Sequence, residues 1–524
     1  MAGYDYVIVG AGSAGCVLAA RLSESREVSV LLLEAGGPDN RREIHIPAAF
    51  SKLFKSQLDW NYSTDPQLNL HGRQLYWPRG KVIGGSSSIN AMIYIRGNAR
   101  DYDDWERLGN PGWSFENVLP FFLKSENQAR IDSEFHGRSG PLRVEDLRTI
   151  NPLSRTFVEA AVETGLPRNE DFNGTVQEGV GFYQVTQKRG RRWSAADAFL
   201  HPARRRRNLT ILPHAHATQI LVEKLRATGV EYVHEGREHA VRACREVILC
   251  GGSINSPQLL LLSGIGAAKH LEETGIEIVH DLPGVGENLQ DHLFLPVAFE
   301  CKRSVSLARA ESLPNFLHYA ALRRGMLTSN IAEAGGFLRT RPDADRPNLQ
   351  YHFGPVYYLE HGFVRPPGHG FSIGPTLIRP ESRGRIRLRT TFPMDPPSIE
   401  PNYLSHASEV DTFVAGIELA RRIAAAKTFD AYRGKEFLPG AEVRTRSEIA
   451  TYVRDAAETT YHPVGTCKMG CDAMAVVDSH LRLRGIDGLR AVDASVMPTV
   501  PSGNTNAPTI MIAEMAADMI RSGN

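Results

Sequence analysis

Residues Tyr4–Val9 (YDYVIV) and the turn after them, GAGSAG at 10–15, determine the fold of the N-terminal region. The apolar run predicts a short buried strand. Residues Cys16–Leu22 (CVLAARL) favour a helix, and Val28–Leu33 (VSVLLL) predicts a second strand that ends at Glu34. This order of strand, glycine-rich turn, helix, strand and acid is typical of a Rossmann unit.

The positions within this unit suit a bound dinucleotide. Gly10 permits the tight turn, Gly12 lets a pyrophosphate approach the backbone, and Gly15 lets the helix pack closely on the strand. The helix N-terminus offers free N–H groups and the positive end of its dipole to the phosphates. Glu34 follows the glycine turn by ~20 residues, the usual spacing of an acid that binds a ribose diol. Its negative charge would repel the 2′-phosphate of NADP. FAD and NAD both remain open from these residues alone.

Composition and charge restrict the class of protein. The chain has 524 residues, which predicts about three units of ~100–200 residues or an intertwined pair. Lys and Arg number 60 against 59 Asp and Glu, and a dedicated nucleic-acid binder would show a basic excess. The local run Arg204–Arg207 is expected to be a solvated turn before a strand at Leu209–Leu212; the alternative is attraction to an anionic membrane.

The cysteines and the hydropathy pattern indicate in which cellular compartment the protein is found. The six cysteines form no CxxC pair, which favours a reducing compartment, and Cys467 and Cys471 lack a second ligand pair, so no metal site is expected. A strand already begins at Tyr4, so no signal peptide is expected, and no apolar run reaches the ~18 residues of a membrane span. We expect a cytoplasmic protein with, at most, a peripheral membrane contact. The sequence carries no signal of oligomeric state.

A first glycine-rich segment is Arg79–Asn90 (RGKVIGGSSSIN). Paired glycines followed by serines suit a backbone that packs against a flat or anionic ligand. A plain surface loop is the alternative, but the apolar stretch Ile89–Ile95 indicates that the segment runs inward.

A second glycine-rich segment is Gly251–Gly266 (GGSINSPQLLLLSGIG), after an expected strand at Glu246–Cys250. Ser256 is predicted to cap a helix with Pro257 at its first position, and Gly264 to end that helix. The pattern is again a strand, a glycine turn and a helix.

These two segments resemble the signature patterns of the glucose–methanol–choline (GMC) oxidoreductases. The resemblance covers essentially the whole chain, including Trp77–Asp101, Asp281–His292 and Tyr461–Glu514. Within the family the chain resembles the aliphatic alcohol dehydrogenases of bacterial alkane utilisation, and it shares much of the pattern with choline dehydrogenases. The resemblance implies FAD as the cofactor.

The fold implied by the resemblance is α/β, or α+β overall. A Rossmann-type FAD-binding domain is interleaved with a substrate-binding domain built on an antiparallel sheet. The FAD-binding domain is expected at 1–141, 202–292 and 453–524, and the substrate-binding domain at 142–201 and 293–452.

The resemblance also implies which residues bind FAD. In some members a histidine before the Asn of the first signature is bonded covalently to the flavin. Here that position is Ile89, which cannot form such a bond, so non-covalent FAD is predicted. The expected cofactor-binding residues are Gly10, Gly12, Ser13, Ala14, Gly15, Glu34, Ala35, Trp60, Val82, Gly85, Asn90, Ala217, Tyr461, Asp493 and Thr505.

Two C-terminal residues are candidates for catalysis. His462 lies between Tyr461 and Pro463, and from local sequence alone it reads as a satisfied buried histidine. Asn506 is, on the same grounds, equally well a cap of a helix that starts near Thr509. The resemblance implies that His462 is the general base while hydride passes to flavin N5. It implies that Asn506 is the partner of His462 and donates to the alcohol oxygen as this becomes alkoxide-like.

The resemblance implies oxidation of a primary alcohol to the aldehyde, with electrons passing to a quinone, a dye or another non-oxygen acceptor. Alternatives are a choline or polyol dehydrogenase, and an oxidase that reduces O2 to hydrogen peroxide. In choline-oxidising relatives a Glu in a context similar to Glu333 pairs with the trimethylammonium group. Here Glu333 is expected to be a structural carboxylate, because one acid without surrounding aromatic rings makes no choline cage.

Overall fold

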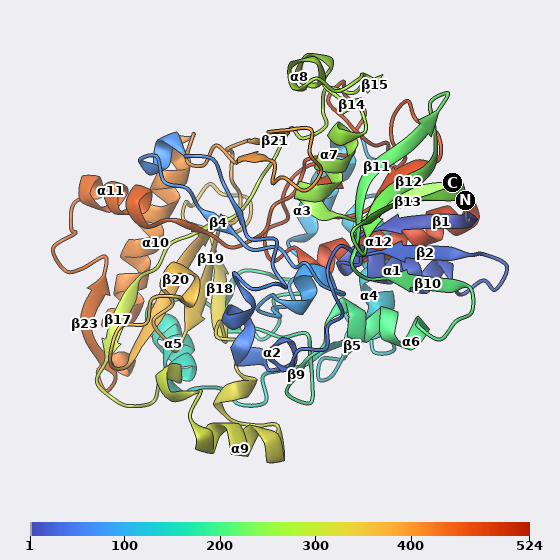
Figure 1. Ribbon diagram of the computed structural model, residues 1–524. Helices are drawn as coiled ribbons and strands as arrows, with labels where there is room; N and C mark the ends of the chain where they lie inside the picture. The colour runs from blue at the N-terminus through green and yellow to red at the C-terminus, as the bar shows by residue number, and fades with distance from the viewer. Residues whose placement is uncertain (1–2, 524) are drawn as a thin grey trace.

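The structure is a computed structural model that describes residues 3–523, and it contains two large sheets (Figure 1). In the first sheet β10, β2, β1 and β13 run parallel in that order, and β25 pairs in parallel with the end of β13. The first half of β13 instead pairs antiparallel with β12, which pairs with β11. The strands are β1 (Gly3–Val9), β2 (Val30–Leu33), β10 (Leu209–Leu212), β11 (Ala215–Glu223), β12 (Arg226–His234), β13 (Arg237–Leu249) and β25 (Leu489–Ala491).

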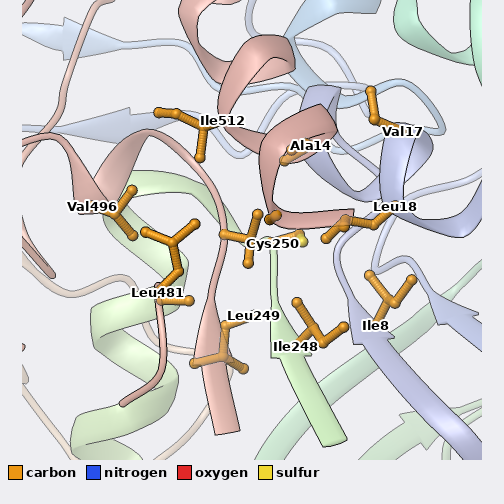
Figure 2. Close-up of a cluster of buried hydrophobic side chains, with 14 of the residues drawn as sticks. Ile8, Ala14, Val17, Leu18, Ile248, Leu249, Cys250, Leu481, Val496 and Ile512 are labelled. Atoms are coloured by element: carbon orange, nitrogen blue, oxygen red, sulfur yellow. The ribbon is translucent and has the colours of Figure 1, made fainter. Parts of the chain in front are cut away.

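Apolar side chains fix helices α1 (Ser13–Leu22) and α12 (Asn506–Ser522) to this sheet. Figure 2 shows Ile8 of β1, Leu18 of α1, Ile248 of β13 and Ile512 of α12 in one cluster, and all four are fully buried. Each such side chain contributes about 1.5–3 kcal/mol on burial. The predicted strand–turn–helix–strand order is therefore present, and it is held by the last helix of the chain.

The second sheet is antiparallel, in the order β23, β17, β20, β19, β18 and β7, with β16 pairing β20 and β24. Helices α5 (Pro152–Glu163) and α10 (Ala407–Ala425) pack on it, and α11 (Arg446–Ala456) packs on α10. The strands are β7 (Gly179–Phe182), β16 (Leu293–Phe294), β17 (Ala298–Cys301), β18 (Ala334–Leu338), β19 (Leu349–Gly354), β20 (Gly370–Leu377), β23 (Arg433–Leu438) and β24 (Glu458–Thr459).

The expected α/β fold with an added antiparallel sheet is confirmed. The strands of the first sheet lie within the segments expected for the FAD-binding domain. Those of the second lie within 142–201 and 293–452, except that β24 continues this sheet to Thr459. The domain boundaries themselves stay a prediction.

The remaining elements are short and connect or cover the two sheets. The helices are α2 (Arg42–His45), α3 (Ala99–Arg107), α4 (Phe115–Ser125), α6 (His201–Ala203), α7 (Gly252–Leu262), α8 (Ala268–Thr274), α9 (Leu313–Leu322), the 3-10 helices η1 (Pro47–Leu53), η2 (Leu68–Leu70), η3 (Gly85–Ser88), η5 (Leu307–Arg309), η6 (Met326–Thr328), η7 (Glu360–Gly362), η8 (Lys427–Phe429) and η9 (Ala494–Val496), and the π-helix η4 (Ala196–Leu200). The strands are β3 (Tyr62–Ser63), β4 (Tyr76–Trp77), β5 (Glu126–Gln128), β6 (Leu142–Val144), β8 (Gln187–Lys188), β9 (Arg191–Arg192), β14 (Ile265–Gly266), β15 (His280–Asp281), β21 (Arg385–Arg387) and β22 (Ser398–Glu400).

Helix α7 begins earlier than predicted, at Gly252, so that Pro257 lies inside it. Proline has no N–H to donate to the carbonyl four residues earlier, which here belongs to Ser253. The hydroxyl of Thr466 donates to that carbonyl instead, at 2.7 Å. A distant residue thus satisfies the group that Pro257 leaves free, and the helix continues through it.

Residues Arg204–Arg207 lie between α6 and β10, and three of the four are exposed, as a solvated turn requires. Arg206 instead donates to the hydroxyl of Ser23, at 2.9 Å. Within residues 3–523, none of the helices combines the length and apolar character that a membrane crossing requires.

Candidate active site

A single large cavity extends from the Rossmann turn to His462. Its empty space, including the part open to solvent, totals about 2240 Å³. All predicted site residues line it except Gly15 and Val82. Residues of the second sheet, including Phe294, His352 and Ser372, line the far end. The cavity therefore joins the predicted dinucleotide site to the predicted catalytic residues.

The glycine turn has the geometry that a dinucleotide requires. Gly10 has φ +100°, and a Cβ there would lie 2.5 Å from the Cys250 carbonyl oxygen. A Cβ on Gly15 would lie 1.9 Å from the Gly10 oxygen, so this glycine serves helix packing. A Cβ on Gly12 would lie 3.9 Å from the Cys250 carbonyl oxygen, an ordinary contact distance. The space beside Gly12 is open to a ligand.

The segment Arg79–Asn90 packs directly on this turn. A Cβ on Gly85 would lie 2.6 Å from the Gly12 Cα, and Gly84 donates its N–H to Ala11 at 2.8 Å. The fully buried Arg192 donates to the Asn90 side-chain oxygen at 2.7 Å. The expectation that this segment runs inward is confirmed.

Two buried carboxylates line the cofactor end. Glu34 accepts the N–H groups of Ala11 and Gly36, each at 2.8 Å, and burial raises its pKa to about 7. Asp493 accepts from the Gly252 N–H at 2.8 Å and the Ser256 hydroxyl at 2.6 Å. Each carboxylate retains lone pairs beyond these bonds, so both can accept from ligand hydroxyls.

His462 is held by its own backbone. Its N–H donates to Asp291 at 2.7 Å, and the preceding Tyr461 has φ +68°. The Tyr461 carbonyl accepts from Arg79 at 2.7 Å. The histidine ring is buried at the substrate end of the cavity, so its position is fixed before any ligand binds.

Asn504 is the amide that contacts the His462 ring, whereas the predicted partner, Asn506, lines the cavity without contacting that ring. The Asn504 Nδ2 lies 3.2 Å from His462 Nε2. The Asn506 Oδ1 instead accepts from the Ser13 hydroxyl at 2.7 Å, which ties the start of α12 to the start of α1. The helix already begins at Asn506, which directs that side chain toward α1 and leaves Asn504 in the preceding turn.

The hydrogen bonds determine which nitrogen of His462 carries the proton. Tyr183 donates its hydroxyl to the Tyr351 carbonyl, so it can only accept from Gln350 Nε2, at 3.1 Å. Gln350 Nε2 also approaches the Asn504 Oδ1, at 3.3 Å. The Asn504 amide nitrogen therefore faces His462 Nε2 as a donor, and that nitrogen presents its lone pair.

The other ring nitrogen of His462 is then the proton donor. Its Nδ1 lies 3.1 Å from His292 Nδ1 and 3.2 Å from the Thr460 hydroxyl. Burial, and the nearby His292, lower the pKa of His462 well below its usual value. A neutral ring with its lone pair at Nε2 is the form that can accept a proton.

Glu333 takes no part in the cavity. Its carboxylate is buried and accepts from the Asn151 N–H at 2.8 Å and from the hydroxyls of Ser154 and Ser329, at 2.7 and 2.6 Å. Burial raises its pKa. The expected structural role of Glu333 is confirmed by these contacts.

The substrate end of the cavity includes an apolar and aromatic wall. Its lining includes no aspartate or glutamate apart from Glu34 and Asp493, which lie at the cofactor end. Tyr358 and Tyr461 join their hydroxyls at 3.1 Å. The apolar and aromatic lining here comprises Phe50, Phe54, Ile89, Phe294, Ile331, Tyr358 and Tyr461.

One group of metal-ligating side chains lies elsewhere among the described residues, formed by Asp39, Asp197 and His201. His201 Nε2 lies 3.1 Å from Asp39, and the two carboxylates raise the pKa of this histidine to about 9. A protonated His201 between two carboxylates accounts for the group as an ion-pair cluster.

Comparisons with known proteins identify the family of the chain. The GMC oxidoreductase family profile matches residues 4–294 and, in its second part, 380–513. An alcohol dehydrogenase (acceptor) of Pseudomonas putida is 49% identical, covering 99% of this chain and 95% of that one. The mitochondrial choline dehydrogenase of Homo sapiens is 46% identical, covering 99% and 90%. Pyridoxine 4-oxidase from Mesorbium loti superposes with a TM-score of 0.92 at 33% identity over 99% of both chains. The chain belongs to the GMC oxidoreductase family.

Proposed function

We propose that this enzyme uses FAD to oxidise a primary, uncharged alcohol to the aldehyde. One observation carries the proposal. His462 Nε2 and Asn504 Nδ2 meet, 3.2 Å apart, at the end of a cavity that continues to the Rossmann turn. A proton acceptor beside a neutral donor is what the oxygen of an alcohol requires as it loses its proton.

The chain's own residues act on the hydroxyl group. The alcohol hydroxyl replaces the direct contact between the two side chains: it donates its proton to His462 Nε2 and accepts from Asn504 Nδ2. The contact of His462 Nδ1 with His292 keeps the lone pair on Nε2 and orients the ring. As negative charge grows on the oxygen, the Asn504 hydrogen bond strengthens.

The cofactor residues lie along the rest of the cavity. The Gly10–Gly15 turn and the start of α1 would hold the pyrophosphate, and Glu34 the ribose. Asp493 and the start of α12, at Thr505 and Asn506, would hold the flavin half. When bound, FAD supplies the hydride acceptor at flavin N5.

The cavity favours an uncharged alcohol over choline. No carboxylate lines its substrate end to balance a quaternary ammonium, and Glu333 is bonded elsewhere. The five aromatic rings there are the feature that favours the choline alternative, because such rings bind ammonium groups through cation–π contacts.

A panel of alcohols tests the substrate class. Under anaerobic conditions the flavin is expected to bleach fastest with octanol, more slowly with benzyl alcohol, and least with choline or glucose. Fastest bleaching by choline would overturn the substrate assignment while leaving FAD-dependent alcohol oxidation intact.

We also propose that electrons pass to a quinone or a dye, with peripheral membrane contact. The similarity to an alcohol dehydrogenase (acceptor) supports this, while the similarity to pyridoxine 4-oxidase favours the oxidase alternative. Measuring hydrogen peroxide during turnover in air, beside the rate with a quinone or dye, separates the two. Peroxide formed in a one-to-one ratio with aldehyde at the full dye-linked rate would show an oxidase.

We propose that FAD is bound without a covalent link. Ile89 lines the cavity at the position of the covalent histidine of other members, and its side chain has no nucleophile. Acid precipitation of the purified enzyme is expected to release all yellow colour into the supernatant. Colour that stays with the precipitated protein would contradict this prediction.

A further inference from the structure

Helix α9 (Leu313–Leu322, LPNFLHYAAL) is exposed yet carries no charged side chain. Its large apolar residues face solvent: Leu313 is 69% exposed, Phe316 45%, Leu317 59% and Leu322 60%. We call these four residues the α9 surface. Isolated exposed apolar residues are ordinary, but a contiguous group on one element marks an interaction site.

One buried residue seats this helix with its apolar side outward. Tyr319 is 2% exposed, and its hydroxyl donates to the carbonyls of Gly190, at 3.1 Å, and His45, at 3.3 Å. The Arg323 guanidinium covers its ring at 4.8 Å. In Figure 1, α9 lies at the outer edge of the molecule, apart from both sheets. Tyr319 therefore fixes the helix to the molecule and leaves the α9 surface exposed.

The surroundings of α9 are basic. Between residues 302 and 324 the chain carries five Lys or Arg residues (Lys302, Arg303, Arg309, Arg323, Arg324) and one acid, Glu311, although the whole chain has a net charge of only +1. Glu311 pairs with Lys52 at 2.9 Å and Arg365 at 3.2 Å. Within residues 3–523, Arg309 and Arg324 are exposed and form no ion pair with a carboxylate.

The same region borders the cavity. Tyr319 packs in a small cluster that includes Ile331, which lines the substrate end. Arg365, held by Glu311, follows the exposed Phe363 and Val364, on the loop whose Tyr358 also lines the cavity.

We infer that α9 docks the enzyme on an anionic lipid bilayer, with the α9 surface inserted among the acyl chains and the flanking arginines at the head groups. An exposed apolar helix with arginines beside it can place apolar side chains among acyl chains and charges at the head groups. Basic residues near an anionic surface add attraction that salt weakens. The inference deepens the proposed function, since an apolar alcohol and a quinone both partition into bilayers. The benefit of membrane docking rests on the proposed function, whereas the docking itself does not.

Sedimentation with vesicles tests the inference on the FAD-loaded full-length enzyme. The unaltered enzyme is expected to bind vesicles of phosphatidylcholine mixed with phosphatidylglycerol, and to bind pure phosphatidylcholine more weakly. The variant L313Q/F316Q/L317Q is expected to lose about tenfold or more in partitioning. Arg309→Gln with Arg324→Gln is expected to weaken binding to the anionic vesicles about fivefold per residue.

The control variant is L68Q/V176Q/L225Q, whose residues are 88%, 60% and 49% exposed away from α9. It should bind vesicles like the unaltered enzyme, and both triple variants should oxidise a short water-soluble alcohol normally. Unchanged vesicle binding by the α9 variant, or no binding by the unaltered enzyme, would overturn the inference. So would a dimer that the α9 variant converts to a monomer, because the surface would then join two copies. Because sedimentation needs no substrate, failure of the proposed catalytic function would appear only in the activity assay.

Discussion

Replacing His462 by alanine is expected to leave FAD bound and to slow flavin reduction by alcohol about 10²- to 10⁴-fold, the range for a general acid–base group. The reason is that Nε2 of this ring presents its lone pair at the substrate end of the cavity, beside the Asn504 amide. Burial lowers its pKa, so the neutral form that accepts protons is present at and above neutral pH. Stopped-flow measurement of flavin bleaching gives the rate directly.

The matched control is His480→Ala, a histidine outside the cavity lining. It should keep both the flavin and the rate. Flavin content and thermal unfolding of His462→Ala should stay close to those of the unaltered enzyme, which separates lost chemistry from lost structure. A near-normal rate in His462→Ala would remove this residue from the mechanism.

Replacing Asn504 by alanine is expected to cost about 10²- to 10³-fold in turnover, as removal of a single donor to a developing oxyanion does. Asn506→Ala removes the bond to the Ser13 hydroxyl, a neutral hydrogen bond with a net contribution of about 0.5–1.5 kcal/mol. Its expected effect is therefore a modest loss of stability with turnover changed much less than in Asn504→Ala.

The two variants form a matched pair, since they delete the same amide two positions apart. Turnover number, flavin content and unfolding temperature should be measured for both. If Asn506→Ala lost activity and Asn504→Ala kept it, the pairing seen at His462 would not be the one used in catalysis.

Local sequence was sufficient where the physical cause is local. The roles of Gly10 and Gly15 follow from backbone crowding within one strand–turn–helix unit, and the structure has that crowding at both, with open space at Gly12. The inward course of Arg79–Asn90 followed from its glycines and the apolar run after it.

Sequence was insufficient where a residue distant in the chain determines the local structure. Pro257 was expected to begin a helix, but the Thr466 hydroxyl satisfies the carbonyl that proline leaves free, and α7 starts earlier. Asn504 and Asn506 stand in one Asn-Thr-Asn stretch, and only the start of α12 and the contact with Ser13 distinguish them.

His292 and Gln350 were missed as part of the site for the same reason. Their bonds to His462 and Asn504 form between elements far apart in the chain. The one available signal for His292 was its place at the end of the Asp281–His292 stretch, which the family resemblance includes.

The proposed function depends on hydride transfer from an alcohol carbon to the bound flavin. Mixing the enzyme anaerobically with 1-octanol and measuring both flavin absorbance and octanal tests this most directly. We expect full bleaching of the flavin, with one aldehyde molecule formed per flavin. Aldehyde released without bleaching, or no bleaching with octanol or any other alcohol, would contradict it.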